Sequence, residues 1–182
     1  MTPADSNALI AQILQGDRQA YAQLVGCYQD GVFAFLWRMG LRRALIEELA
    51  QETFVRAWRH LGDFEPERAA FSTWLFAISR NLALNEINRA GHRREVAAED
   101  DLELASADEG PPEALARKRS SLRLHAALGR LDPAQRSVLG LCCLSELSIA
   151  EVAVIEGISA GAVKVRLHRA RHALRLSLEN LR

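Results

Sequence analysis

Hydrophobic side chains recur every three or four positions along much of this chain, the spacing that places them on one face of an α-helix. One such stripe consists of Ile46, Leu49, Ala50, Phe54, Ala57, Trp58 and Leu61. A second begins near Ser72, which we expect to cap its helix, and consists of Trp74, Leu75, Ile78, Leu82 and Ile87. Between residues 3 and 91, β-branched residues do not alternate with polar ones as they do in strands. The pattern predicts an all-α fold.

The helical pattern is interrupted between residues 93 and 113. This stretch carries six acidic residues between Glu99 and Glu109, followed by Gly110, Pro111 and Pro112, and it has no aromatic residue. Such a composition buries too little apolar surface to offset the entropy of ordering the chain. We therefore predict two small helical domains, residues 1–92 and 114–182, joined by a flexible acidic linker at 93–113. A linker of this length predicts loosely tethered domains.

The second domain contains the pattern of a helix-turn-helix. Ser148 and Glu151 are spaced as a capping box, and Gly157 interrupts the apolar pattern where a turn is expected. Ser159 can then cap a second helix, which carries Val163 on its apolar face. Two short helices joined by such a turn are the form that places side chains in a DNA major groove.

The second helix of this pair is basic and uncompensated. Residues 164–175 include no Asp or Glu, and the cationic and histidine positions at its start are Lys164, Arg166, His168, Arg169 and Arg171. A surface hairpin with a solvated charged face is the alternative interpretation, but such faces usually mix charges of both signs. The one-sided charge favours contacts with phosphates and bases.

The overall composition restricts the possible functions of the chain but does not identify one. The formal net charge is zero, so only the distribution of charge indicates nucleic acid. The N-terminal segment lacks the pattern of a signal peptide and no apolar run is long enough to span a bilayer, so we expect a cytoplasmic protein. Cys27, Cys142 and Cys143 lie among apolar residues, which predicts buried free thiols rather than a disulfide or metal site.

The helix that follows residue 72 has a polar side next to aromatic residues. Phe64 and Phe71 flank its start, and its amides and arginines are Arg80, Asn81, Asn85, Asn88 and Arg89. Aromatic faces, amides and cations together are what single-stranded nucleic acid requires for stacking, base reading and phosphate binding. The alternative is that Phe71 and Trp74 belong to the core, since both keep helical register with Ile78.

Two sets of motifs in this order resemble the bacterial extracytoplasmic-function (ECF) RNA polymerase sigma factors, group four of the sigma-70 family. The region 2 set comprises residues 47–54 with Trp58, and residues 71–75 with Ile78, Arg80 and Asn81. The region 4 set comprises Leu131, Leu139 and Gly161 with residues 135–136, 147–148, 151–153, 157–159, 163–164, 166–167 and 169–171. The resemblance covers nearly the whole chain from Asp17 to Leu178.

The resemblance implies a transcription initiation factor with three binding surfaces. The first docks on the clamp helices of the polymerase's largest subunit and consists of Glu48, Gln51, Glu52 and Arg56. The second captures a flipped base and holds the minus-ten strand, and it consists of Phe64, Phe71, Arg80, Asn81, Asn85, Asn88 and Arg89. The third reads the minus-thirty-five duplex and consists of Lys164, Val165, Arg166, His168, Arg169 and Arg171.

The resemblance also implies partners and a mode of regulation. Besides promoter DNA, these are the flap of the polymerase's second-largest subunit and an anti-sigma factor, either free or membrane-bound. No catalytic residue, cofactor or metal is expected. Within the third surface, Ala162 and Val165 replace a threonine and a small polar residue of the family. Val165 can pack on a thymine methyl group but cannot donate a hydrogen bond.

Two other functions compete with this interpretation. A stand-alone helix-turn-helix regulator would explain residues from Leu131 onward, but it leaves the surface around Glu48 without a role. Polymerase-dependent recruitment distinguishes the two. An enzyme would need a metal or catalytic site, and the only candidate pair is His168 and His172, spaced i, i+4 without a third ligand nearby.

Overall fold

The computed structural model describes residues 2–96, 112–144 and 147–181, and every regular element in these ranges is helical. The first half contains α1 (Pro3–Leu14), α2 (Arg18–Arg38), α3 (Arg43–Arg59), a short 3-10 helix (Leu61–Asp63) and α4 (Phe71–Val96). The second half contains α5 (Pro112–Gly129), α6 (Pro133–Cys142), α7 (Ile149–Glu156) and α8 (Ala160–Glu179). The predicted all-α fold is confirmed. Residues 97–111 of the predicted linker lie outside the described residues.

Local sequence signals set where these helices begin. The Asp17 side chain accepts hydrogen bonds from the backbone N–H groups of Gln19 and Ala20, and Asp132 does the same for Ala134 and Gln135. Both contacts satisfy donors that a helix start leaves without an intrahelical partner. The expectation that Ser72 caps its helix is wrong: α4 begins at Phe71, so Ser72 already lies in its first turn, where it is buried.

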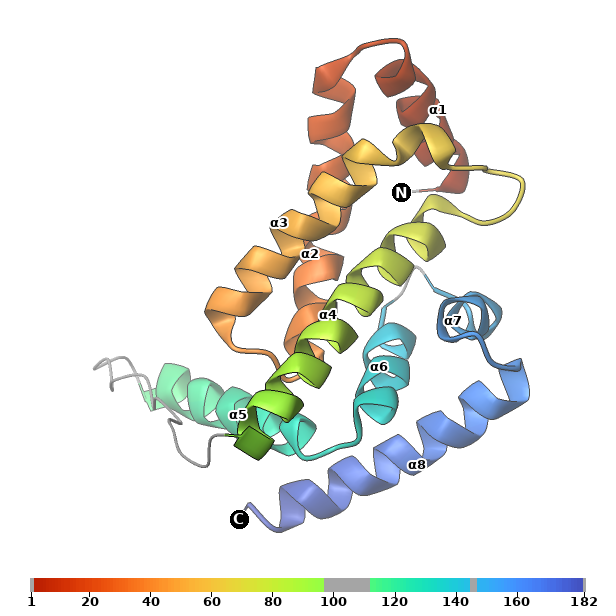
Figure 1. Ribbon diagram of the computed structural model, residues 1–182. Helices are drawn as coiled ribbons and strands as arrows, with labels where there is room; N and C mark the ends of the chain where they lie inside the picture. Colours follow the sequence, from red (N-terminus) through yellow and green to blue (C-terminus); the bar gives the residue numbers. More distant parts are fainter. Residues whose placement is uncertain (1, 97–111, 145–146, 182) are drawn as a thin grey trace.

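The buried apolar side chains of both halves belong to one core. In the first half, α2, α3 and α4 pack on one another, and the fully buried side chains include Val32, Phe35, Leu36, Leu75 and Phe76. In the second half, α6 packs against both α7 and α8, and the fully buried side chains include Val138, Leu141, Val152, Val163 and Ala170. Figure 1 shows α8 running beneath α6 and α5 as one continuous helix.

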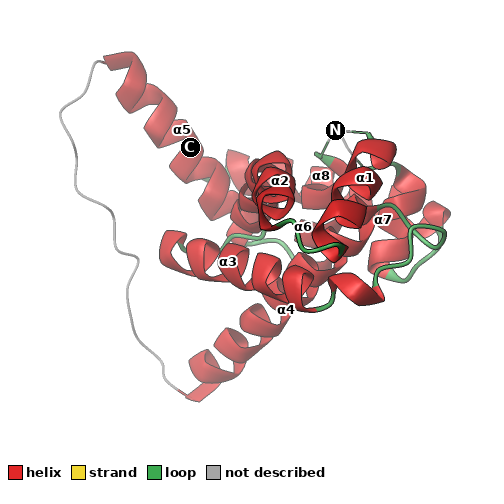
Figure 2. Ribbon diagram, turned by 90° about the horizontal axis from the view of Figure 1, so that it is seen from above, coloured by secondary structure: helices red, strands yellow, loops and turns green. Residues whose placement is uncertain are grey.

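The two halves are packed together rather than loosely tethered. Helix α6 lies against α2, and α7 lies against α4; Figure 2 shows α6 next to α2 in a view from above. The expectation of loose tethering is therefore wrong for this structure. Linker length limits how far apart two domains can move, but it does not set whether their surfaces attract.

The cysteine prediction is corrected in part. All three thiols are free, but Cys27 and Cys143 are exposed and only Cys142 is partly buried. Burial raises the pKa of the Cys142 thiol, with the neighbouring Cys143 thiol adding to the shift. Cys142 is therefore a protonated, unreactive thiol at neutral pH.

Candidate nucleic-acid interface

Helices α7 and α8 form the predicted helix-turn-helix. The Ser148 hydroxyl accepts from the Glu151 backbone N–H at 3.2 Å, and the Glu151 carboxylate accepts from the Ser148 backbone N–H at 2.7 Å. These two bonds complete the predicted capping box. Gly157 ends α7 with φ +66°, a left-handed conformation in which glycine avoids the strain of a Cβ. The Ser159 hydroxyl then caps α8 by accepting from the Ala162 N–H at 3.1 Å.

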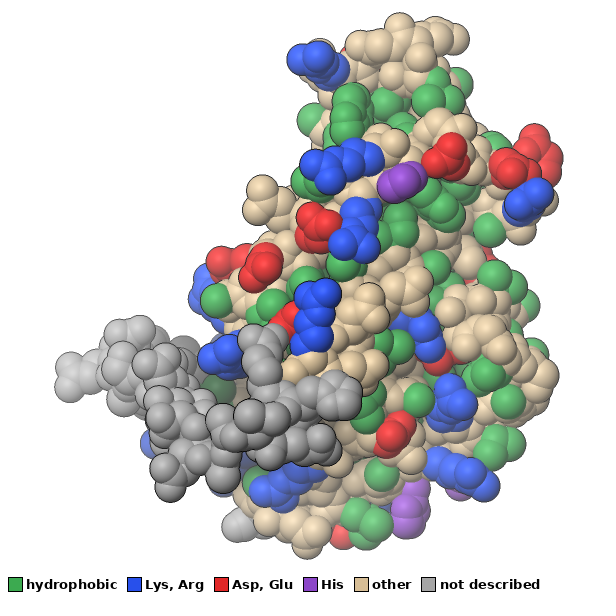
Figure 3. Space-filling model, in the orientation of Figure 1, with side chains coloured by type: hydrophobic (Ala, Val, Ile, Leu, Met, Phe, Trp, Pro, Cys, Tyr) green, Lys and Arg blue, Asp and Glu red, His purple; other side chains and the backbone are tan. Residues whose placement is uncertain are grey.

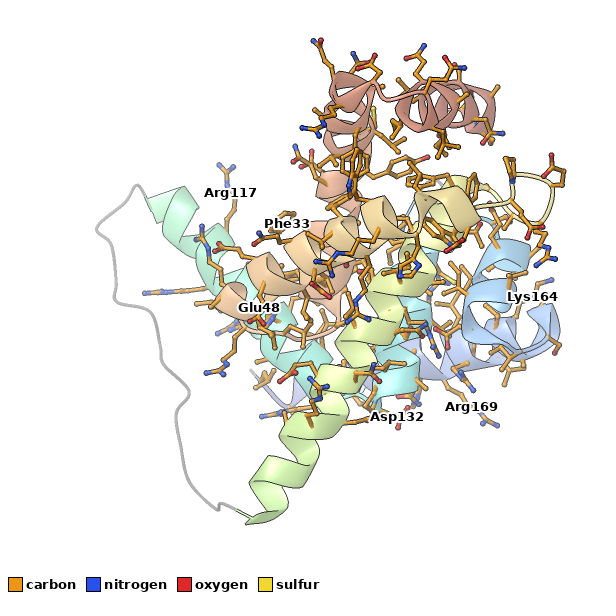
Figure 4. All side chains as sticks on the ribbon, turned by 45° about the horizontal axis from the view of Figure 1, so that its top comes forward. Phe33, Glu48, Arg117, Asp132, Lys164 and Arg169 are labelled. Atoms are coloured by element: carbon orange, nitrogen blue, oxygen red, sulfur yellow. The ribbon has the colours of Figure 1, made fainter. Side chains whose placement is uncertain are left out.

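The exposed face of α8 carries the predicted duplex-reading residues. Val163, Leu167 and Ala170 are buried and fix the rotation of the helix. The exposed positions are Lys164, Val165, His168, Arg169 and Arg171. Lys164 and Arg169 point outward from α8 in Figure 4, and Figure 3 shows Lys, Arg and His side chains gathered over this part of the surface. Arg166 differs, because its side chain is only 33% exposed and turns toward α7.

Helix α4 carries the polar residues of the predicted minus-ten surface, and these differ in exposure. Asn81, Asn85, Asn88 and Arg89 are exposed. Arg80 is only 17% exposed in its side chain and donates to the Asn81 side-chain oxygen at 3.3 Å. Arg89 lies 3.7 Å from Glu86 in an ion pair within the same helix. Asn81, Asn85 and Asn88 therefore form a row of amides on an accessible face of α4. Arg80 lies at the edge of the interface between the two halves.

The aromatic part of the predicted minus-ten surface lies in the core. Phe71 is 1% exposed and packs edge-on against Tyr28 and Phe64, with ring centroids 5.3 and 5.6 Å away. Phe64 is 9% exposed and also contacts Trp74. In this conformation neither ring presents a face for stacking. For Phe71 the geometry favours the core interpretation that the sequence left open.

The predicted polymerase-docking residues share the outer face of α3. Glu48, Gln51 and Arg56 are exposed, and Glu52 pairs with Arg56 at 2.7 Å in an i, i+4 ion pair. Their helix packs on α2 and α4 through its opposite, apolar face. Figure 4 shows Glu48 on this outer side. The four side chains therefore form one accessible polar surface in the first half of the chain.

Sequence reasoning missed the residue that connects two of these surfaces. Glu156, at the C-terminal end of α7, has a fully buried side chain that pairs with Arg80 at 2.9 Å and with Arg166 at 3.4 Å. A signal was present: Glu156 is the only acidic residue between Glu151 and Glu179, and an acidic side chain at a helix C-terminus is opposed by the helix dipole. Such a residue needs a compensating cation.

A second carboxylate also links the two halves. Burial raises the pKa of Glu151, but hydrogen bonds from the Ser148 backbone and hydroxyl and from the Thr73 hydroxyl outweigh it, so the net pKa is lowered. The Thr73 bond, 3.1 Å long, runs from α4 to α7. Glu151 is therefore held ionised both by its own helix cap and by the other half of the chain.

Metal and membrane alternatives find no structural counterpart in the ranges described. Residues 2–96, 112–144 and 147–181 contain no group of three or more His, Cys, Asp or Glu side chains placed to hold a metal ion. His168 and His172 are both exposed on α8. None of the helices formed by the described residues is long and apolar enough to cross a membrane.

Comparison with known proteins identifies both halves. Residues 24–93 match the family Sigma-70 region 2, and residues 121–174 match Sigma-70, region 4. The ECF RNA polymerase sigma factor SigW of Bacillus subtilis is 34% identical over 180 residues, covering 94% of this chain and 96% of SigW. The RNA polymerase sigma factor CnrH of Cupriavidus metallidurans is 32% identical over 188 residues, covering 98% of this chain and 97% of CnrH.

Solved structures show the same arrangement of helices. CnrH in complex with the cytosolic domain of CnrY is 28% identical, with a TM-score of 0.69, and covers 97% of this chain and 98% of that chain. RpoE of Bartonella quintana, solved with the anti-sigma factor NepR, has a TM-score of 0.68 at 24% identity, covering 87% of this chain and 96% of that chain. This second likeness shows the fold alone.

The matches decide between the three functions that the sequence left open. A stand-alone regulator would need only the second half, whereas the region 2 match accounts for the first half as well. The chain therefore belongs to the ECF sigma factors, non-enzymatic proteins that direct RNA polymerase to promoters.

Proposed function

We propose that this sigma factor uses the three surfaces described above for different tasks, one to bind polymerase and two to bind promoter DNA. The outer face of α3, with Glu48 and Gln51 at its centre, docks on the clamp helices of the polymerase. The α4 amides hold the non-template minus-ten strand as the duplex melts, and α8 reads the minus-thirty-five duplex. Because both polymerase and promoter lie in the cytoplasm, the protein acts there.

The row of exposed amides on α4 is the observation that carries the proposal. Asn81, Asn85 and Asn88 are spaced at four and three residues, so they lie along one side of the helix. An amide can donate to and accept from the edge of an unpaired base. Asn81 is the best candidate for base capture, since it adjoins Arg80, a cation that can hold phosphate. Flipping a base requires unstacking energy, which such contacts offset.

The polymerase surface is tested by holoenzyme assembly. Replacing Glu48 and Gln51 with alanine should weaken binding to core polymerase at least tenfold, while the fold stays intact because both side chains are exposed. Glu47→Ala is the matched control, since Glu47 is an exposed acid on the same helix that pairs with Arg43. If the double variant binds core polymerase as tightly as the parent protein, this face of α3 is not the polymerase contact.

The minus-ten surface is tested by separating the steps of initiation. Asn81→Ala should reduce promoter opening, measured by permanganate reactivity of unpaired thymines, more than it reduces closed-complex binding. Gln29→Ala, which removes an exposed amide from α2, is the control. Equal losses at both steps would contradict base capture.

The proposal includes an anti-sigma factor as the protein's inhibitor. The support is that the related CnrH was solved in complex with the cytosolic domain of CnrY. The protein should therefore copurify from unstressed cells with a stoichiometric partner whose removal restores polymerase binding. Purification of a free, polymerase-competent protein from such cells would contradict this part.

A further inference from the structure

The Glu156 carboxylate lies where the two halves of the chain meet. Oε1 accepts from Arg80 Nε at 2.9 Å and from the Ser137 hydroxyl at 2.5 Å. Oε2 accepts from Arg80 Nη2 at 3.1 Å and from Arg166 Nη1 at 3.4 Å. The pairing with Arg80 is bidentate, the geometry in which an arginine–carboxylate contact is strongest.

The two arginines on this carboxylate come from different promoter surfaces. Arg80 belongs to the α4 face proposed for the minus-ten strand, and Arg166 belongs to the α8 face proposed for the minus-thirty-five duplex. While both donate to Glu156, Arg80 keeps only 17% of its side chain exposed. A phosphate or base edge would have to displace Glu156 to reach it. The packed arrangement and DNA binding by Arg80 therefore exclude one another.

Further contacts also join the two halves. Arg136 of α6 is buried and donates to the Met39 carbonyl at 2.8 Å, at the C-terminal end of α2, where a cation is favoured. The His125 ring of α5 lies tilted against Trp37, with ring centroids 5.3 Å apart, and its Nε2 lies 3.0 Å from the Leu41 carbonyl oxygen. Because these contacts join specific groups of the two halves, the halves meet in one specific interface.

Helix α6 approaches α2 closely at a glycine. A Cβ on Gly140 of α6 would lie 3.1 Å from the Phe35 ring and 3.4 Å from the Arg38 Cβ, both on α2. A side chain at Gly140 would therefore require Phe35 or Arg38 to shift, and a large one would oppose the packing of α6 on α2. Within α6 itself, by contrast, glycine is a poor helix former and most replacements favour the helix. A substitution there acts against closure without weakening its own helix.

The polymerase-docking face of α3 takes no part in this interface. Glu48, Gln51 and Arg56 stay exposed while Arg80 is engaged. The closed arrangement therefore leaves the proposed polymerase contact available and occupies a promoter contact. An order of events follows: docking on polymerase comes first, and exposure of Arg80 follows.

We propose that Glu156 is a latch that holds the free chain closed, so that Arg80 reaches promoter DNA only after the two halves separate. A buried ion pair adds little net stability, because desolvation offsets the attraction, and its best-attested use is to specify one arrangement over others. The role of the promoter contacts rests on the proposed function above. The closure itself does not, and it can be measured on the free protein without polymerase or DNA.

The test is a distance distribution between the halves. Spin labels on the exposed Cys27 of α2 and Cys143 at the end of α6, in a Cys142→Ala background, report separation by double electron–electron resonance. Glu156→Gln keeps the shape of the side chain and removes its charge, and Gly140→Leu opposes closure by size alone. Glu65→Gln is the matched control, because it removes a carboxylate from an exposed ion pair with Arg68 inside one half.

The latch predicts one narrow distance for the parent protein and for Glu65→Gln. Glu156→Gln should lower the ratio of closed to open molecules by about tenfold or more, the usual effect of losing a charged hydrogen bond. A broad distribution of spin-label distances in the parent protein would overturn the latch. So would a Glu156→Gln variant that stays closed, even if Gly140→Leu opens the chain. Should Glu156→Gln lose its helical circular dichroism, Arg80→Gln replaces it, since Glu156 then keeps Ser137 and Arg166.

Discussion

Replacing Gly157 with alanine should destabilise the helix-turn-helix, and the structure gives the size of the effect. Gly157 has φ +66°, and a Cβ built there meets no heavy atom within 4 Å. Steric overlap therefore contributes nothing, and the penalty is the strain of a left-handed non-glycine residue, about 1–2 kcal/mol. For a chain of this size, each 1 kcal/mol lowers the melting temperature by about 2–4 °C.

Gly161 provides a matched control with the opposite sign. It lies in the first turn of α8, where a Cβ would contact only the Ser159 hydroxyl oxygen at 3.8 Å. Gly161→Ala should therefore stabilise the helix by up to about 1 kcal/mol. Thermal melts and urea titrations of both variants, monitored by circular dichroism, measure the two effects. Equal shifts, or a neutral Gly157→Ala, would refute the assigned turn geometry.

Three further predictions follow from the same contacts. Phe71→Ala should lower the free energy of unfolding by about 3–5 kcal/mol because the ring is buried. Asn81→Ala removes an exposed side chain and should change the free energy of unfolding by less than about 0.5 kcal/mol. Similar values for the two variants in urea titrations would contradict the placement of Phe71 in the core and Asn81 on the surface. Arg166→Ala should weaken holoenzyme binding to the cognate minus-thirty-five duplex by about 1–3 kcal/mol and relax the sequence preference. An unchanged sequence preference in competition assays would show that Arg166 does not read a base. Because the pKa of Glu151 is lowered in the folded protein, its ionised form stabilises the fold, and stability should fall as the pH drops below the ordinary glutamate pKa of 4.5. Glu151→Gln should reduce that slope in urea titrations, and an identical slope would contradict the assignment.

Much of the local structure was predictable because its causes are local. The capping box at Ser148 and the glycine at 157 act over a few residues, and each formed as expected. Most residues of the two apolar stripes are buried or half-buried, since burial follows helical spacing wherever a core exists, but Trp58 is 43% exposed. The candidate surface on α8 came from its one-sided basic charge, whereas the candidate surface on α3 was implied only by the resemblance to sigma factors.

The docking of the two halves was not predictable, because it depends on residues far apart in sequence. Arg80 and Glu156 are separated by 76 positions, and each alone is typical of a solvated or DNA-facing charge. Gly140 and Arg136 gave no local signal that they face α2. The cysteine error has the same origin, since apolar neighbours in sequence do not determine which helix face a thiol occupies.

The most direct test of the account is run-off transcription by purified core polymerase, with and without this protein, on a library of genomic fragments. A sigma factor with these surfaces should give new start sites that share one minus-ten and one minus-thirty-five element, and the Glu48 and Gln51 double variant should abolish them. Absence of new starts, while the protein binds duplex DNA by itself, would contradict it and favour a regulator that acts without polymerase.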